Sequence, residues 1–100
     1  MKNRAINRDI IEVFFRDKPF MIISALRSNN GKVNASELAR QAKCTYSHAR
    51  KILMLFEENR LISFNRPSTR PTISLTEKGN QLAEEVEKIK EILKHNGRKY

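Results

Sequence analysis

The sequence predicts a mainly α-helical domain that carries one small β-hairpin and ends in a long helix. Three observations predict this class. Apolar residues recur at helical spacing in successive segments of the first 59 residues, two short alternating segments enclose the turn-forming sequence "NRPSTRP", and a regular apolar repeat follows Thr76. A chain of 100 residues is long enough for one domain, and small enough that a partner could contribute to its stability.

The first segment, Asn7–Arg16, fits helix and strand periods about equally. The spacing of Ile6, Ile10 and Phe14 favours a helix. We therefore expect a short helix before the main domain.

The second helix is predicted from its end signals. Asp17 can cap it, Pro19 falls in its first turn, and Gly31 in "SNNGK" is its expected stop. Its inward positions are Phe20, Ile23 and Leu26.

Two further helices follow in close succession. Asn34 is the expected cap of one, and Glu37 stands at capping-box spacing from it. Its buried stripe is Leu38, Ala39 and Ala42. Thr45 caps the next helix, which we expect to run to about Asn59.

The helix at about 45–59 has two distinct faces on a helical wheel. Its core positions are Ala49, Ile52, Leu53 and Phe56, and its outward positions are Ser47, Arg50, Lys51 and Met54. An α-helix fits the major groove of B-form DNA, and its first turns reach the base edges. The candidate DNA contacts on this helix are therefore Thr45, Tyr46, Ser47, His48, Arg50 and Lys51. The alternative is that these charges only solvate an exposed face.

Two strands are predicted after this helix. Ile62 and Phe64 alternate in the first, and Ile73 and Leu75 in the second. The prolines of "NRPSTRP" would remove ladder hydrogen bonds from a central strand, so we expect an edge hairpin. The order of elements predicts a winged helix-turn-helix, with residues 17–75 as its core and residues 76–94 as a C-terminal dimerisation helix.

The run "LISFNRPSTRPTISLTEKG" resembles the wing and following segment of winged-helix regulators of the MarR and PadR type, many of them archaeal. The resemblance covers about Pro19 to Ala83. It implies sequence-specific binding to double-stranded DNA by a homodimer that represses or activates transcription. In such proteins the wing, here 65–72, lies along the backbone and can place an arginine in the minor groove. The corresponding wing residues are Arg66, Ser68, Thr69 and Arg70. Charge on this hairpin could instead prevent edge pairing.

Two positions depart from the family pattern. The family usually has glycine in the turn where this sequence has Lys43, and glycine before the strand where "EENRLI" has Arg60. Asn59 or Arg60 must then adopt the left-handed conformation, and asparagine is the easier candidate.

The last helix carries an apolar repeat at intervals of four and three. Its positions are Leu75, Gly79, Leu82, Val86, Ile89 and Leu93. Such a seam predicts a two-fold dimer, with Leu82, Val86, Ile89 and Leu93 as the dimerisation residues. The alternative is that the helix packs back on its own domain.

The charge balance favours a polyanionic partner. Apolar residues make up 39% and charged residues 31% of the chain, and the formal net charge is +9. Such an excess indicates nucleic acid or an anionic membrane surface, although it could serve solubility alone. No helix opposes a basic face to a bulky aromatic one, so we expect no membrane partner.

Other classes of site find little support in the sequence. Cys44 is more typical of a small buried hydrophobe than of a redox sensor. His48 and His95 are far apart, so we expect no metal, and no residue set suggests a cofactor or catalysis. The single cysteine and the absence of a signal or spanning segment predict a soluble cytoplasmic protein, associated with the nucleoid.

The leading hypothesis is a dimeric transcriptional regulator that reads a short inverted repeat. An architectural protein that coats DNA with little sequence preference would use the same wing and helix, and the ratio of specific to non-specific affinity separates the two. A winged-helix module that docks a polymerase or replication protein is a third possibility, and failure to bind any duplex would favour it.

Overall fold

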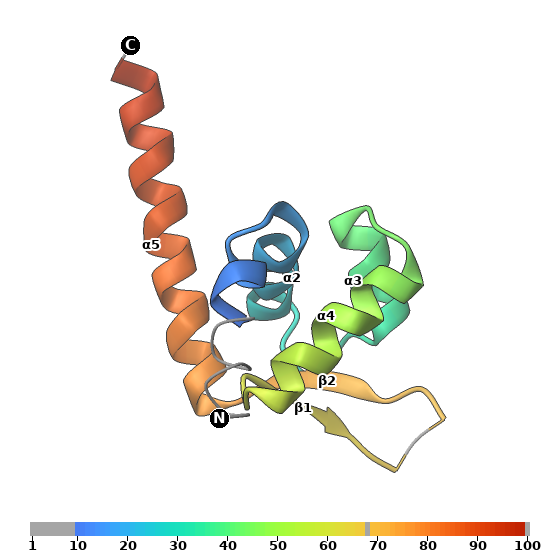
Figure 1. The fold of residues 1–100 in the computed structure, drawn as a ribbon. Helices are drawn as coiled ribbons and strands as arrows, with labels where there is room; N and C mark the ends of the chain where they lie inside the picture. The colour runs from blue at the N-terminus through green and yellow to red at the C-terminus, as the bar shows by residue number, and fades with distance from the viewer. Residues whose placement is uncertain (1–9, 68, 100) are drawn as a thin grey trace.

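The computed structural model of the protein describes residues 10–67 and 69–99. Residues 10–14 are helical, as expected, residues 15 and 16 form the turn that follows, and residues 7–9 of the first segment lie outside the described residues. The elements that follow are α2 (Asp17–Ser28), α3 (Ala35–Ala42), α4 (Tyr46–Glu58), β1 (Ile62–Asn65), β2 (Thr72–Leu75) and α5 (Glu77–Lys99). Figure 1 shows α2, α3 and α4 packed together, the hairpin beneath them, and α5 extending away. The predicted mainly α fold with a β-hairpin wing and a long C-terminal helix is confirmed.

The ends of α2 differ from the prediction. Arg16 is the N-cap, without a side-chain hydrogen bond, and Asp17 is the first helical residue, where its carboxylate is favourable near the positive end of the helix dipole. At the other end, Asn29 is the C-cap, and its side-chain amide donates to the carbonyl of Ala25 at 2.9 Å. Gly31 lies beyond the helix with a φ of 76°, so it shapes the following loop and does not end α2.

The two caps predicted for the helix-turn-helix are confirmed. The side chain of Asn34 accepts the N–H of Glu37 at 2.9 Å, and the hydroxyl of Thr45 accepts the N–H of His48 at 3.1 Å. Lys43, where the family has glycine, adopts the left-handed conformation with a φ of 58°. Helices α3 and α4 are therefore joined by a turn that a lysine can form.

The left-handed residue before β1 is Arg60, with a φ of 61°, and not Asn59. Asn59 is 8% exposed, and its side-chain amide donates to the carbonyl of Leu55 at 2.8 Å. Its own carbonyl accepts the ammonium of Lys78 at 3.1 Å. Because these bonds hold Asn59 at the end of α4, the strained conformation falls on the exposed arginine after it.

The hairpin is antiparallel, with Ile62 opposite Leu75 and Phe64 opposite Ile73. Ile73 also forms a bridge to Val33 in the loop before α3, and its side chain is fully buried. The base of the wing is thereby held on both sides of β2 and packed against the helical core. The prolines of the wing lie outside both strands.

The first part of α5 belongs to the core of the domain. Gly79, Ala83 and Val86 are buried, and a Cβ on Gly79 would lie 1.9 Å from the carbonyl oxygen of Leu61. Thr76 caps the helix by accepting the N–H of Gly79 at 3.0 Å, as predicted. The helix runs to Lys99, beyond the expected end near residue 94. Its C-terminal half extends past the rest of the molecule (Figure 1).

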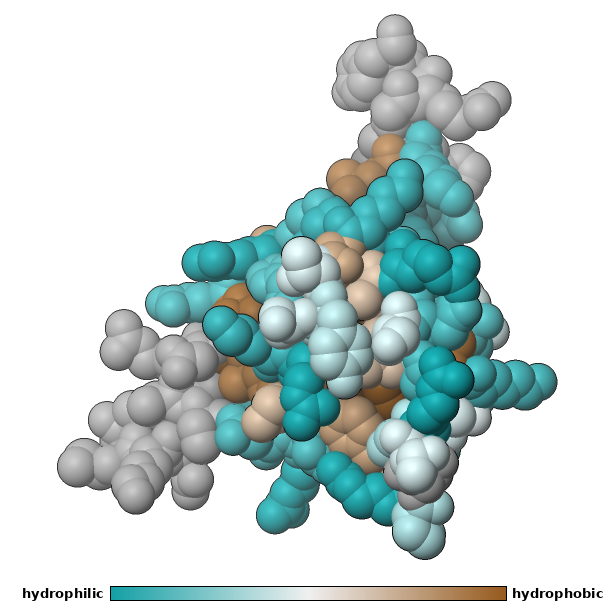
Figure 2. Space-filling view, turned by 90° about the vertical axis from the view of Figure 1, so that its right-hand side faces the viewer, coloured by the Kyte–Doolittle hydropathy of each residue, from teal (hydrophilic) through white to brown (hydrophobic). Residues whose placement is uncertain are grey.

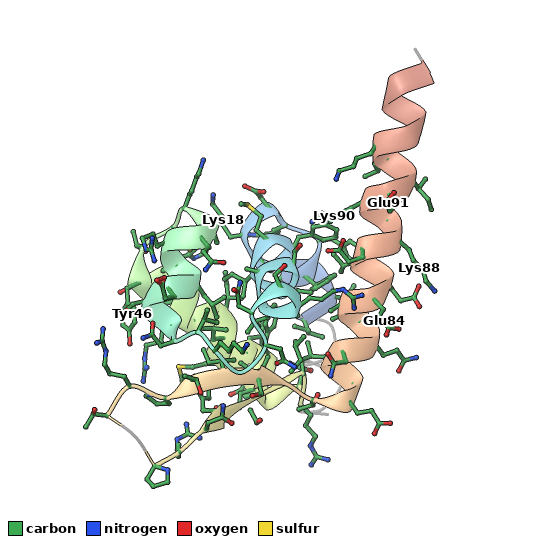
Figure 3. All side chains as sticks on the ribbon, turned by 180° about the vertical axis from the view of Figure 1, so that it is seen from behind. Lys18, Tyr46, Glu84, Lys88, Lys90 and Glu91 are labelled. Carbon is green, nitrogen blue, oxygen red and sulfur yellow. The ribbon has the colours of Figure 1, made fainter. Side chains whose placement is uncertain are left out.

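A polar cluster joins α5 to α2 above this core. The ammonium of Lys90 donates to the hydroxyl of Ser24 at 2.8 Å, and the same hydroxyl donates to Glu87 at 3.3 Å. Lys90 and Glu87 also form an ion pair at 3.5 Å. In Figure 3, Lys90 points from α5 toward α2. The angle between α5 and the helical core is therefore held by side chains from both helices.

Candidate nucleic-acid interface

The exposed face of α4 has the composition that the wheel predicts. Ser47, Arg50, Lys51 and Met54 are exposed, while Ala49, Ile52, Leu53 and Phe56 are buried. The flanking residues Tyr46 and His48 are also exposed. The acidic residues of α4, Glu57 and Glu58, lie at its C-terminal end, so the first turns are the positive part of the helix.

A small pocket joins the first turn of α4 to the wing. It has a volume of about 260 Å³, and its wall includes Tyr46 and Arg50 from α4, Thr69 and Arg70 from the wing, and Asn34 at the start of α3. We call it the wing pocket. Two arginines that are 20 positions apart in the sequence thus border one site, without an acidic side chain in its lining.

Arg66 occupies a different environment from Arg70. Its guanidinium pairs with Glu57 at 3.5 Å and stands over the ring of Phe64, 5.0 Å from the centroid. The side chain therefore bends back from the wing toward the end of α4. Ser68, the other predicted contact of the wing, lies outside the described residues.

A second groove borders α4 between this helix and the turn before α2. It has a volume of about 400 Å³, and its charged or ionisable lining residues are Arg16, Asp17, Lys18, His48 and Lys51. Ile52, Leu55, Val13 and Pro19 form its apolar part. We call it the turn groove. Nothing in the sequence was a reason to name Arg16 and Lys18 as DNA contacts. Their position beside Pro19, at the start of a helix, is the one feature that could have indicated it.

The face that contains the start of α4 and the wing is largely hydrophilic. Figure 2 shows weakly polar side chains near its centre, surrounded by strongly hydrophilic ones, with hydrophobic surface confined to small areas. Figure 3 shows Tyr46 and Lys18 on the part of the molecule remote from α5, whereas Glu84, Lys88 and Glu91 lie along α5. The start of α4 therefore lies on a different side of the molecule from the charged residues of α5.

The predicted dimerisation residues divide into two groups. Val86 is 1% exposed and belongs to the core of its own domain, so it is not available at a seam. Leu82 is half-buried, while Ile89 and Leu93 are 39% and 65% exposed. Ile92, outside the predicted repeat, is 57% exposed beside them. The exposed patch of α5 is thus Ile89, Ile92 and Leu93.

An apolar groove of about 440 Å³ lies between the first helical segment and α5. Ile11 and Phe15 border it and are 61% and 72% exposed, and Leu82 borders it from α5. Phe14 lies in the same groove but is buried against Phe20 and Phe56. Apolar surface therefore continues from the first segment onto α5.

Other kinds of site are not found in the described part of the chain. No group of three or more histidine, cysteine or acidic side chains is placed to hold a metal ion among these residues. None of the helices searched there is long and apolar enough to cross a membrane. Cys44 is a free, half-buried thiol packed against the core.

Several solved structures share this fold. A variant of MepR from Staphylococcus aureus, bound to an oligodeoxyribonucleotide, matches 94% of this chain and 71% of its own with a TM-score of 0.71 and 15% identity. The MarR family transcriptional regulator SPO1453 from Silicibacter pomeroyi matches 95% of this chain and 67% of its own, with a TM-score of 0.70 and 19% identity. A protein of Archaeoglobus fulgidus matches 83% of this chain and 94% of its own, with a TM-score of 0.69 and 24% identity.

No protein-family model and no curated protein sequence matches this chain. The structural matches show a winged helix-turn-helix fold of the MarR type, which confirms the resemblance seen in the sequence at the level of the fold.

Proposed function

We propose that this protein is a transcriptional regulator that binds double-stranded DNA as a homodimer. Helix α4 enters the major groove, and the wing lies on the backbone or in the minor groove. The observation that carries the proposal is the basic first half of α4, which borders the wing pocket together with Arg70. The net charge of +9 and the fold shared with a regulator bound to an oligodeoxyribonucleotide support it.

The proposed contacts lie in the exposed N-terminal turns of α4 and on the wing. Thr45, Ser47 and Arg50 would meet base edges or phosphates from the first turns, since these are the part of a recognition helix that reaches the bases. Arg70 would meet the backbone beside them. Arg66 is a weaker candidate than the sequence suggested, because its ion pair with Glu57 would have to open first.

The homodimer is proposed from the exposed apolar surface. Ile89, Ile92 and Leu93 form a patch at helical spacing on a part of α5 that projects from the domain (Figure 1), and Ile11 and Phe15 add to it at the groove. Exposed apolar surface of this kind is an interface or an aggregation hazard, and pairing of two copies would cover it. In this proposal residues 17–75 read the DNA, and the helix beyond them pairs two copies.

The test is binding to duplex DNA over a range of salt concentrations, after selection of bound sites from a random pool. With ~5 phosphates met per protomer, the slope of log K against log salt should be about −0.9 per phosphate, and so about −9 for a dimer. A slope shallower than about −2 would contradict the proposal. Recovery of no preferred site, with binding intact, would instead favour an architectural DNA-binding protein.

A further inference from the structure

The wing pocket and the turn groove use opposite sides of α4. At about 100° per residue, the wheel directions of Tyr46 and Arg50 are about 160° from the mean direction of the α4 residues in the turn groove. Those residues are His48, Lys51, Ile52 and Leu55. Ser47 and Met54 fall between the two sides and are exposed. The outward ridge of α4 therefore has a basic site on each flank.

The turn groove has the charge that a phosphate backbone requires. Arg16, Lys18 and Lys51 are cationic, and Asp17 is the one acidic residue in the lining. Asp17 lies 3.6 Å from the ammonium of Lys18, and because the side chain of Asp17 is 76% exposed and that of Lys18 29% exposed, water screens this pair in part. His48 adds a ring N–H that can donate to a phosphate oxygen. Of the four residues that can be cationic, Arg16, His48 and Lys51 are exposed and Lys18 is half-buried.

The dimensions of B-form DNA relate the two sites to its two strands. The major groove is about 12 Å wide, and an α-helix with its side chains is about 10–12 Å across. A helix in this groove thus has one sugar-phosphate strand on each flank. A basic site on each side of the helix then faces a different strand.

We propose that the turn groove binds the phosphates of one DNA strand while the wing pocket binds those of the other, so that the domain straddles the major groove. This inference rests on the proposed function and assigns phosphate-binding roles to Arg16, Lys18 and Lys51. These contacts position α4 and carry no base preference of their own.

The first measurement is the salt dependence of binding to a duplex of random sequence. Lys18→Gln and Lys51→Gln should each lower the slope by about 0.9 per lost phosphate, and so by about 1.8 for a dimer, with base preference unchanged. Lys88→Gln on α5 is the matched control, since Lys88 is exposed and remote from both sites. Thermal melting verifies that each variant folds, and Arg16→Gln replaces Lys18→Gln if that variant does not.

The second measurement assigns each site to a strand. Single phosphates of a selected duplex are replaced by neutral methylphosphonates, one strand at a time within one half-site. Lys18→Gln should remove the sensitivity to neutral phosphates on one strand, and Arg70→Gln should remove it on the other.

Two results overturn the inference and leave the proposed function standing. One is that Lys18→Gln and Lys51→Gln bind like Lys88→Gln while Arg70→Gln binds more weakly than the wild type. The other is that Lys18→Gln and Arg70→Gln lose sensitivity on the same strand. If the wild-type protein binds no duplex at low salt, the proposed function and this inference both fail.

Discussion

Close backbone contact at Gly79 fixes the start of α5. The Cβ of an alanine there would lie 1.9 Å from the carbonyl oxygen of Leu61, which also accepts the N–H of Thr76 at 3.0 Å. The obstacle is backbone, and a side-chain rotation cannot remove it.

We therefore predict that Gly79→Ala lowers the free energy of unfolding by about 2 kcal/mol, because overpacking of up to about 3 kcal/mol outweighs the roughly 1 kcal/mol of helix propensity that alanine adds. Asn80→Ala, at the next and exposed position, should change it by less than about 0.5 kcal/mol. Urea denaturation of both variants measures the difference. Equal stability of the two variants would contradict the contact.

Residue-level prediction from the sequence was right for three of the four predicted N-caps, wrong for Asp17, and poor for strained backbone. Asn34, Thr45 and Thr76 cap their helices as expected, because a cap needs only a side-chain oxygen at the right place in the local sequence. Of Asn59 and Arg60, asparagine is the easier candidate for the left-handed conformation, but Arg60 adopts it. The amide of Asn59 instead bonds to Leu55 and its carbonyl to Lys78, a residue 19 positions away. Local propensity does not contain that second contact.

At the scale of the element, the cap of α4 supports the residues proposed to contact DNA. Thr45 accepts the N–H of His48, and Tyr46 and Ser47 belong to the same first turn. We predict that Thr45→Ala lowers stability by about 1 kcal/mol, since the N–H of His48 loses its partner.

Thr45→Ser retains the hydroxyl and serves as the control. Its stability should stay close to that of the wild type, and duplex affinity should fall for Thr45→Ala more than for Thr45→Ser. Denaturant titration and duplex titration give the two readouts. A loss of stability in Thr45→Ser as large as in Thr45→Ala would show that the cap is not the cause.

The order of elements was predictable because each has its own periodicity. The placement of two basic sites on opposite sides of α4 could not be predicted from the sequence. Arg16 and Lys18 reach α4 only because residues 10–14 and α2 pack beside it, and no spacing in the sequence brings residue 18 next to residue 51. The ion pair between Arg66 and Glu57 could not be predicted either, because it also depends on how the wing packs beside α4.

At the scale of the whole molecule, the apolar residues of α5 are buried in the first part of the helix and exposed farther along it. Its repeat was read from the sequence as a single seam, because periodicity records which side of a helix is apolar and not what covers it. Packing against α2 and Leu61 covers Gly79, Ala83 and Val86, and leaves Ile89 and Leu93 exposed farther along. Dimerisation and folding should therefore respond to different substitutions.

We predict that Glu at both Ile89 and Leu93 separates the protomers and leaves the fold intact. Like charges buried at a two-fold seam cost several kcal/mol, whereas in the separated chain these positions face water. Val86→Glu should instead unfold the domain, because it places the charge in the core of a single chain. Glu84→Gln, at an exposed position earlier on the same helix, should change neither property.

Sedimentation at micromolar concentration and far-ultraviolet dichroism distinguish these variants. Ile89→Glu combined with Leu93→Glu should sediment as a monomer with its helical signal preserved, and Val86→Glu should lose that signal. Affinity for a duplex with two half-sites should fall toward that for one half-site, since the second contact is no longer intramolecular. A wild-type protein that sediments as a monomer and still binds a palindrome cooperatively would place the dimer interface somewhere other than α5.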